Sequence, residues 1–327
     1  MNDNIRVNPA IQLAAGGLAG ATGAIATSPL EFLKTRLQST TGQQFLTGKH
    51  APSVVPYYTG TKLWLGLQTA RHFSSSVTVG ASSVVKYFEH IYTAEGGLKA
   101  FYKGLRPALI GIIPGKAIYF LSYSKYKELF NRICCTPNSD QVHLLSAVSA
   151  GATMSTITSP IWVIKTRVQL DTGHNRIGSI AYHIQRIWHR DGFKGFYRGL
   201  SASYAGAAET GVYFVFYERL KIYFASRRDS YSPMYMDYLL SASAAKLLAV
   251  SLCYPHEVVR TRLRQDSTGP RKYRSFVQTL LKVWSEERLV GLYGGMSLHL
   301  LRAVPNTAIT FLTYEAVMTI INSYNFI

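Results

Sequence analysis

"SPLEFLKTRLQ" (residues 28–38) places a proline, an acid and two bases directly after an uncharged run, and similar stretches with the proline and the bases recur twice. The second copy is "SPIWVIKTRVQ" at 159–169, and the third is "YPHEVVRTRLR" at 254–264. A second element follows each copy and reads "GLKAFYKGL" at 97–105, "GFKGFYRGL" at 192–200 and "VGLYGGM" at 290–296. Two elements repeated three times in the same order indicate an internal threefold repeat.

The spacing of the two elements predicts a single domain over 1–327 that contains three repeats. The proline of the first element and the tyrosine of the second lie 37 and 38 residues apart in the second and third copies, but 73 apart in the first. The first repeat therefore holds a Ser/Thr/Gly-rich insertion at about 41–80. We expect the repeats at about 1–135, 136–228 and 229–327, each with a short amphipathic surface helix such as "SFVQTLLKVW" at 275–284.

Low charge over long windows predicts membrane spans. Only 16% of the 327 residues are charged, below the ~25% of a typical soluble domain. Windows 10–30 and 144–164 are uncharged, and windows near 104–124, 199–217, 235–255 and 303–324 carry few charges. Each is long enough to cross a hydrocarbon core of ~30 Å. We therefore expect an all-α membrane protein with six transmembrane helices.

The net charge of +18 comes from bases scattered through loops and helix ends. Because no basic run is present, nucleic acid is not an expected partner; the charge suits an anionic substrate or the positive-inside bias of loops. Cys134, Cys135 and Cys253 show no metal-ligand spacing, so we expect neither a metal site nor a disulfide framework. No cleaved targeting segment is visible in "MNDNIRVNPA".

The repeated motif resembles that of the mitochondrial carrier family, P-x-[DE]-x-x-[KR]-x-[KR], which is followed by acidic-Gly and aromatic-basic-Gly elements. The resemblance covers nearly the whole chain, except the insertion and both tails. It implies six tilted helices in three pseudo-symmetric repeats around one cavity, with surface helices on the matrix side. It also implies a multi-pass protein of the mitochondrial inner membrane that works as a monomer in the lipid bilayer, with cardiolipin as a candidate lipid.

A ring of ion pairs is expected at the matrix end of the cavity. Each proline should bend its helix toward the axis, and an acid and a base three residues apart lie on one helix face. The predicted kinks are Pro29, Pro160 and Pro255, and the predicted matrix gate is Glu31, Lys34, Lys165, Glu257 and Arg260. Trp162 occupies the acid position of the second repeat, so at most two of the three links form. The family's bracing glutamine position holds Gln38, Gln169 and, as a departure, Arg264.

The even-numbered spans end in a related motif on the cytosolic side. It reads "YSKYK" at 123–127, "YERLK" at 217–221 and "YEAVM" at 314–318, so Ser124 lacks the acid and Met318 lacks the base. The remaining members of the predicted cytosolic gate are Lys127, Glu218, Lys221 and Glu315. Each gate has one link fewer than a full ring, which should lower the barrier to opening.

Asymmetric polar positions are the candidates for substrate binding, because the scaffold is threefold and a substrate is not. Lys246 stands nine residues before its proline, where the other repeats have glycine, and a lysine within a span is costly unless it has a function. Lys116, Glu209 and Arg302 lie within five residues of helix, or ~7.5 Å of depth. This layer would suit a polyphosphate anion. Glu209 would bind a base head group or pair with Lys116 or Lys246, and Gly206 would admit a nucleobase or serve helix packing.

Three stretches narrow the resemblance to one branch. "PIW" in the second repeat resembles carriers of pyrimidine nucleotides, NAD, FAD and folate. "YPHEVVRTRLR" with "KYRSF", and "SASYAGAAET", are most similar to the pyrimidine nucleotide carriers, which implies exchange of pyrimidine (deoxy)nucleotides by alternating access. A carrier of NAD, FAD or folate and a non-transporting membrane adaptor are the alternatives. An enzyme and a cofactor are not expected, and His143, His256 and His299 read as isolated interfacial or packing residues.

Overall fold

The computed structural model describes residues 9–47, 81–133, 139–172, 179–226, 234–265 and 271–324. Within these ranges every regular element is a helix. The long helices are α1 (Pro9–Gln38), α4 (Leu105–Ile133), α5 (Asp140–Leu170), α7 (Leu200–Ser226), α8 (Met234–Cys253) followed by α9 (Pro255–Arg264), and α11 (Met296–Tyr324). The short helices are α2 (Thr40–Thr47), α3 (Ala81–Ala94), η2 (Gly97–Tyr102), α6 (Ile180–Asp191), η3 (Phe193–Tyr197) and α10 (Phe276–Leu292). The all-α fold class is confirmed.

The six long helical segments correspond to the six low-charge windows. By length and hydropathy alone, two segments of the described chain can cross a membrane, Gly97–Ile133 and Asp140–Leu170. The bent pair of Asp237–Cys253 and Pro255–Arg264 forms a third. Beyond α2, the predicted insertion at 41–80 lies outside the described residues.

The three motif prolines do not act alike. Pro29 and Pro160 lie inside the continuous helices α1 and α5. At Pro255 the third repeat divides into α8 and α9, which meet at a bend of 48°. Pro255 stands at the start of α9, where a missing backbone N–H costs little because it would have no partner in the helix. A break between helices is therefore observed at one motif proline.

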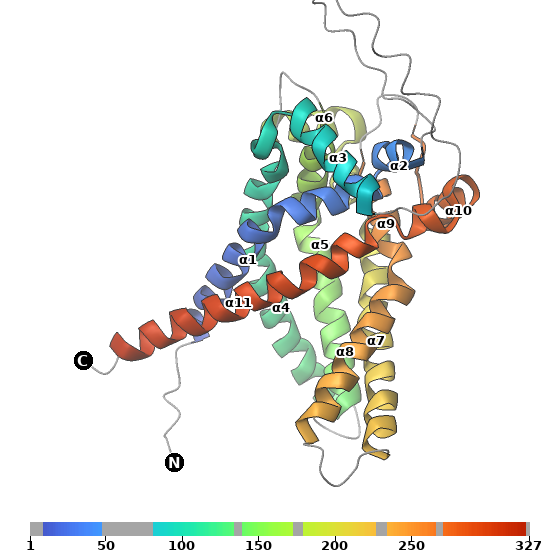
Figure 1. The fold of residues 1–327 in the computed structure, drawn as a ribbon. Helices are drawn as coiled ribbons and strands as arrows, with labels where there is room; N and C mark the ends of the chain where they lie inside the picture. Colours follow the sequence, from blue (N-terminus) through green and yellow to red (C-terminus); the bar gives the residue numbers. More distant parts are fainter. Residues whose placement is uncertain are drawn as a thin grey trace, which may run out of the picture.

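The short helices gather at one end of the bundle. In Figure 1, α2, α3, α6 and α10 lie at the upper end, where α1, α5 and α9 finish, and α7 ends and α8 begins at the lower end. The helix α1 packs along α11 and α4, and α5 packs against α4 and α7. The contact between α1 and α11 needs a glycine, since a Cβ on Gly23 would lie 2.5 Å from Thr310 Oγ1. The long helices thus form a bundle that is capped at one end.

Buried ion pairs attach the cap to the long helices. The second base of each proline motif reaches an acid of its own repeat: Arg36 to Glu95 at 2.8 Å, Arg167 to Asp191 at 3.2 Å, and Arg262 to Glu287 at 2.6 Å. The three arginines are among the most buried large side chains. Sequence reasoning missed this role, although the repeated spacing of the second base was visible. These pairs determine where the cap sits on the bundle.

Candidate functional site

Two ion pairs join the repeats at the capped end. Glu31 on α1 is paired with Lys165 on α5. Lys34, one turn further along α1, places Nζ 2.5 Å from Glu257 Oε2 on α9. All four side chains are at most 19% exposed. The acid of one repeat therefore meets the base of the next, in the cyclic order expected from the motif spacing.

The third position of the ring lacks this ion pair. Trp162, at the acid position of the second repeat, donates its Nε1–H to Thr158 Oγ1 at 3.1 Å. Its ring lies 4.8 Å from Lys165 Nζ, a cation–π contact. Arg260, without an acid opposite it, pairs with Glu257 of its own helix. The ring is thus closed by two links between repeats and one pair within a helix.

Two side chains of α11 reinforce the ring from a direction that the motif did not indicate. His299 Nδ1 lies 2.8 Å from Lys34 Nζ; because the ammonium can only donate, this nitrogen accepts. Arg302 Nη1 lies 3.3 Å from Glu31 Oε1. Arg302 was expected in the substrate layer, and it sits here against a gate acid. The prediction that His299 is isolated was wrong, and no sequence signal connected it with Lys34.

His143 and His256 also have partners. His143 Nδ1 lies 2.6 Å from the Tyr123 hydroxyl, and His256 Nδ1 lies 2.5 Å from the carbonyl oxygen of Cys253. Both contacts are local to the ends of the long helices. Their reading as packing residues remains an interpretation.

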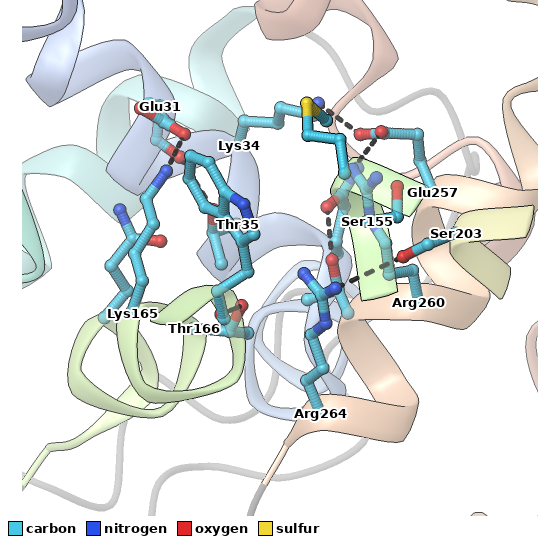
Figure 2. A pocket seen from close by; sticks show the side chains of 15 residues that line it. Glu31, Lys34, Thr35, Ser155, Lys165, Thr166, Ser203, Glu257, Arg260 and Arg264 are labelled. Carbon is cyan, nitrogen blue, oxygen red and sulfur yellow. Dashed lines mark hydrogen bonds and ion pairs between the residues drawn. The ribbon is translucent and has the colours of Figure 1, made fainter. Parts of the chain in front are cut away.

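A polar hollow of about 260 Å³ lies beside the ring (Figure 2). Its lining runs from Met154 and Ser155 on α5 to the bracing positions at the ends of the motif helices. Gln38 donates to the Tyr254 hydroxyl at 3.0 Å and accepts from Thr261 at 2.8 Å. The third bracing position holds Arg264, which donates to Ser203 Oγ at 3.2 Å. The repeats are therefore braced differently at this level.

The predicted substrate layer is only partly assembled in this structure. Lys246 Nζ lies 2.7 Å from Glu209 Oε1, and the lysine side chain is 59% exposed. Lys116 Nζ donates to the carbonyl oxygen of Gly16 at 2.6 Å. Together with the position of Arg302 beside Glu31, these contacts give one acid–base pair and two bases directed elsewhere. Of the alternatives for Glu209, the pairing with Lys246 is the one that the structure contains.

Gly206 serves helix packing here. A Cβ at this position would lie 2.7 Å from His256 Nε2, so a larger residue would require the His256 side chain to move. This contact supports the packing alternative over an approach by a nucleobase.

The four residues of the predicted cytosolic gate are not joined to one another. No ion pair links Lys127, Glu218, Lys221 and Glu315, all of which lie in the described part of the chain. Lys221 Nζ instead lies 6.0 Å from the Tyr217 ring and 5.6 Å from the Tyr238 ring. The two predicted rings therefore differ in state, because the one beside the cap is paired and the one at the far end is not.

A second hollow of about 400 Å³ lies between α4, α5 and α7. Aromatic side chains dominate its lining, among them Tyr119, Tyr123 and Tyr213. Tyr119 lies one turn along α4 from Lys116. This hollow suits an aromatic ring better than a phosphate group.

Comparison with known proteins gives the family. The model described as "Mitochondrial carrier protein" matches residues 6–59, 61–133, 137–228 and 232–325. Solute carrier family 25 member 36 of Gallus gallus is 40% identical over 95% of this chain and 97% of its own length. Solute carrier family 25 member 33 of Homo sapiens is 40% identical, covering 95% of each chain. Mitochondrial carrier protein rim2 of Schizosaccharomyces pombe is 38% identical over 95% of this chain and 89% of its own length. Three repeats of paired helices, a paired ring beside the cap and these matches together show that the chain belongs to the mitochondrial carrier family, whose members are transporters and not enzymes.

Proposed function

We propose that the protein exchanges pyrimidine (deoxy)nucleotides across the mitochondrial inner membrane by alternating access, as a multi-pass monomer in the bilayer. The observation that carries this proposal is the difference between the two rings. The ring of Glu31, Lys34, Lys165, Glu257 and Arg260 is paired, while the far ring is not. A bundle closed beside its cap and unpaired at the other end is one of the two states that alternating access requires.

The three bases of the predicted substrate layer, here called the basic layer, recognise the nucleotide. Lys246 and Lys116 act as mobile point charges for phosphate oxygens, and Arg302 can grip a phosphate through two parallel N–H groups. Each would exchange a present partner for phosphate: Lys246 leaves Glu209, Lys116 leaves the Gly16 carbonyl, and Arg302 leaves Glu31. Glu209, once released, can accept from the amino or imino group of the base. The aromatic hollow beside Lys116 offers the base a stacking surface.

Release of Arg302 connects binding with opening. Glu31 loses one of its two cations when Arg302 turns to phosphate, so α11 loses its ion pair with the ring while the pair of Glu31 and Lys165 remains. Exposed ion pairs contribute about 0–1 kcal/mol each, and pairs as buried as these cost more to break. Substrate must therefore bind the opened state more tightly than the closed state, since only differential affinity can shift the equilibrium.

Uptake into liposomes tests the proposal. Purified protein in vesicles preloaded with CTP should take up labelled UTP, and ATP, NAD and folate should compete poorly. Lys246→Ala should lose at least about tenfold in uptake, since it removes a charge-assisted contact to the substrate. Lys194→Ala is the control, because Lys194 is an exposed lysine of the cap.

The competition pattern separates the alternatives. Inhibition by NAD, FAD or folate alone would assign the protein to a neighbouring substrate class of the same branch. Reconstituted protein that moves none of these compounds would favour a non-transporting adaptor and would contradict the proposal.

A further inference from the structure

The polar hollow beside the ring holds more positive than negative charge. Four bases line it, namely Lys34, Lys165, Arg260 and Arg264, against the two acids Glu31 and Glu257. Both acids already have two cationic partners each, since Glu31 contacts Lys165 and Arg302, and Glu257 contacts Lys34 and Arg260. No carboxylate of this lining remains for Arg264. An anion from outside would balance the excess.

Arg264 lines this hollow, and one donor of its guanidinium has no acceptor in the described structure. The residue is 7% exposed, and the one hydrogen bond of its guanidinium is from Nη2 to Ser203 Oγ at 3.2 Å. Its Nε–H is buried without an acceptor in the described structure. The other two repeats have Gln38 and Gln169 at this position, so the arginine is not required by the threefold scaffold. Figure 2 shows Arg264 extending into the space between Thr166 and Arg260.

The absence of an acid in the second repeat affects the same region. Trp162 lines the hollow but provides no negative charge, so Arg260 turns to an acid of its own helix. Arg260 pairs with Glu257 of its own helix and still keeps 31% of its side chain exposed. Part of its guanidinium is therefore open to a further partner. Arg260 and Arg264 lie one turn apart on α9 and thus share one helix face.

We propose that Arg260, Arg264 and Lys165 form a second anion subsite, which binds the terminal phosphates of the nucleotide. This inference deepens the proposed function and rests on it. A volume of about 260 Å³ is below the ~300–1,000 Å³ of sites that enclose a whole small molecule, so the hollow suits a phosphate tail and not a complete nucleotide. Two guanidinium groups on one face match phosphate oxygens in geometry as well as charge.

The subsite also explains how a phosphate tail promotes opening. A phosphate bound to Arg260 competes with Glu257, and a phosphate bound to Lys165 competes with Glu31. Each exchange replaces a link of the ring by a contact to substrate, so binding in the hollow offsets the cost of breaking the ring. Nucleoside triphosphates should therefore be carried more efficiently than monophosphates, and the hollow should be the reason.

Two variants test the subsite without altering the basic layer. Arg264→Gln gives the third repeat the side chain of the other two, and Trp162→Glu supplies a carboxylate that competes for Arg260. Arg274→Gln, an exposed arginine of the cap, is the charge-matched control. Uptake of labelled UMP and UTP is measured for each protein in liposomes, with thermal unfolding in the presence of UMP, UTP or pyrophosphate as the second readout.

The subsite predicts that Arg264→Gln raises KM for UTP about tenfold, while KM for UMP changes less than twofold, since a charged hydrogen bond is of that size. Trp162→Glu also completes the ring and so affects both nucleotides, but it should raise KM for UTP more than KM for UMP. Equal changes for UMP and UTP would overturn the subsite while leaving the proposed function intact. A variant that is no longer stabilised by pyrophosphate but has an unchanged KM for UTP would also overturn the subsite, because the hollow would then bind free pyrophosphate and not the phosphate tail of the nucleotide. Wild-type protein that carries neither nucleotide would overturn the proposed function itself. If Trp162→Glu fails to fold, Arg264→Gln alone decides the outcome.

Discussion

Arg288 is strained, and the strain is specific to the third repeat. It has φ 57° and ψ −149° within α10, almost the conformation of Gly192, with φ 59° and ψ −156°, after α6. This region of the backbone map is accessible essentially to glycine, and other residues pay about 1–3 kcal/mol to occupy it. The side chain of Arg288 is exposed, so its removal should cost little. We expect Arg288→Gly to raise the midpoint of thermal unfolding by about 2 °C or more.

Gly192→Ala is the reciprocal variant. A Cβ at Gly192 would meet nothing within 4 Å, so any loss of stability would report backbone strain alone. A midpoint that falls for Gly192→Ala but does not rise for Arg288→Gly would contradict the assignment of strain to Arg288.

Individual residues were predictable where the repeat gave three copies to compare. The cyclic pairing of Glu31 with Lys165 and of Lys34 with Glu257 follows from motif spacing and threefold order. The contacts of His299 and Arg302 did not follow, because both residues come from α11, which lies outside the proline motifs. The role of Arg302 in substrate binding stays a prediction.

At the scale of elements, a buried acid in each repeat holds the helices of the cap on the bundle. Asp191 at the end of α6 contacts Arg167 on α5 at 3.2 Å and Arg198 at 3.6 Å, and it also pairs with Arg271 before α10. Its carboxylate is 2% exposed. Asp191→Asn leaves buried arginines without a counter-charge, which typically costs about 3–5 kcal/mol. We expect a clear fall in the midpoint of thermal unfolding, measured in detergent.

The pH dependence of this difference follows from the pKa of Asp191. Burial raises this pKa, but the hydrogen bond from Arg271 and the charge of Arg198 outweigh burial, so the pKa lies below its ordinary value of 3.8. A lowered pKa means that the carboxylate stabilises the fold above pH ~4, and that this contribution is lost as the pH falls through the folded-state pKa. The stability gap between wild type and Asp191→Asn should be constant from pH 8 to pH 5 and shrink below pH 4. A gap that grows on acidification would contradict this account.

At the scale of elements, hydrophobic periodicity and low charge predicted the six long helices and the surface helices. The continuity of α1 and α5 through their prolines was not predictable, since a proline can either break a helix or be accommodated within it. The break at Pro255 differs because α9 starts there as a separate helix. The cap pairs were not predicted because the motif contains the second base but not its acid, which stands in a separate element of the cap.

The whole molecule has one end with a paired ring and one end with an unpaired ring. Adding the charges that the unpaired ring lacks should favour the state that is closed at that end. The unpaired end lacks an acid at Ser124 and a base at Met318. Ser124→Glu combined with Met318→Lys restores a complete ring, which should stabilise the state closed at that end by up to about 1 kcal/mol per added pair. The population open at that end should then fall by up to about fivefold per added pair.

Cys253 reports this population. It lies seven residues along α8 from Lys246, on the same helix face, and is half-buried. A membrane-impermeant maleimide should label Cys253 more slowly in Ser124→Glu/Met318→Lys than in wild type, as read from the mass of the peptide that contains it. Ser124→Gln/Met318→Gln is the uncharged control and should label at the wild-type rate. Because ion pairs between exposed groups are screened by salt, the difference in labelling rate should narrow as ionic strength rises. Equal slowing in the charged and uncharged variants would show that side-chain bulk, and not a completed ring, controls access to Cys253.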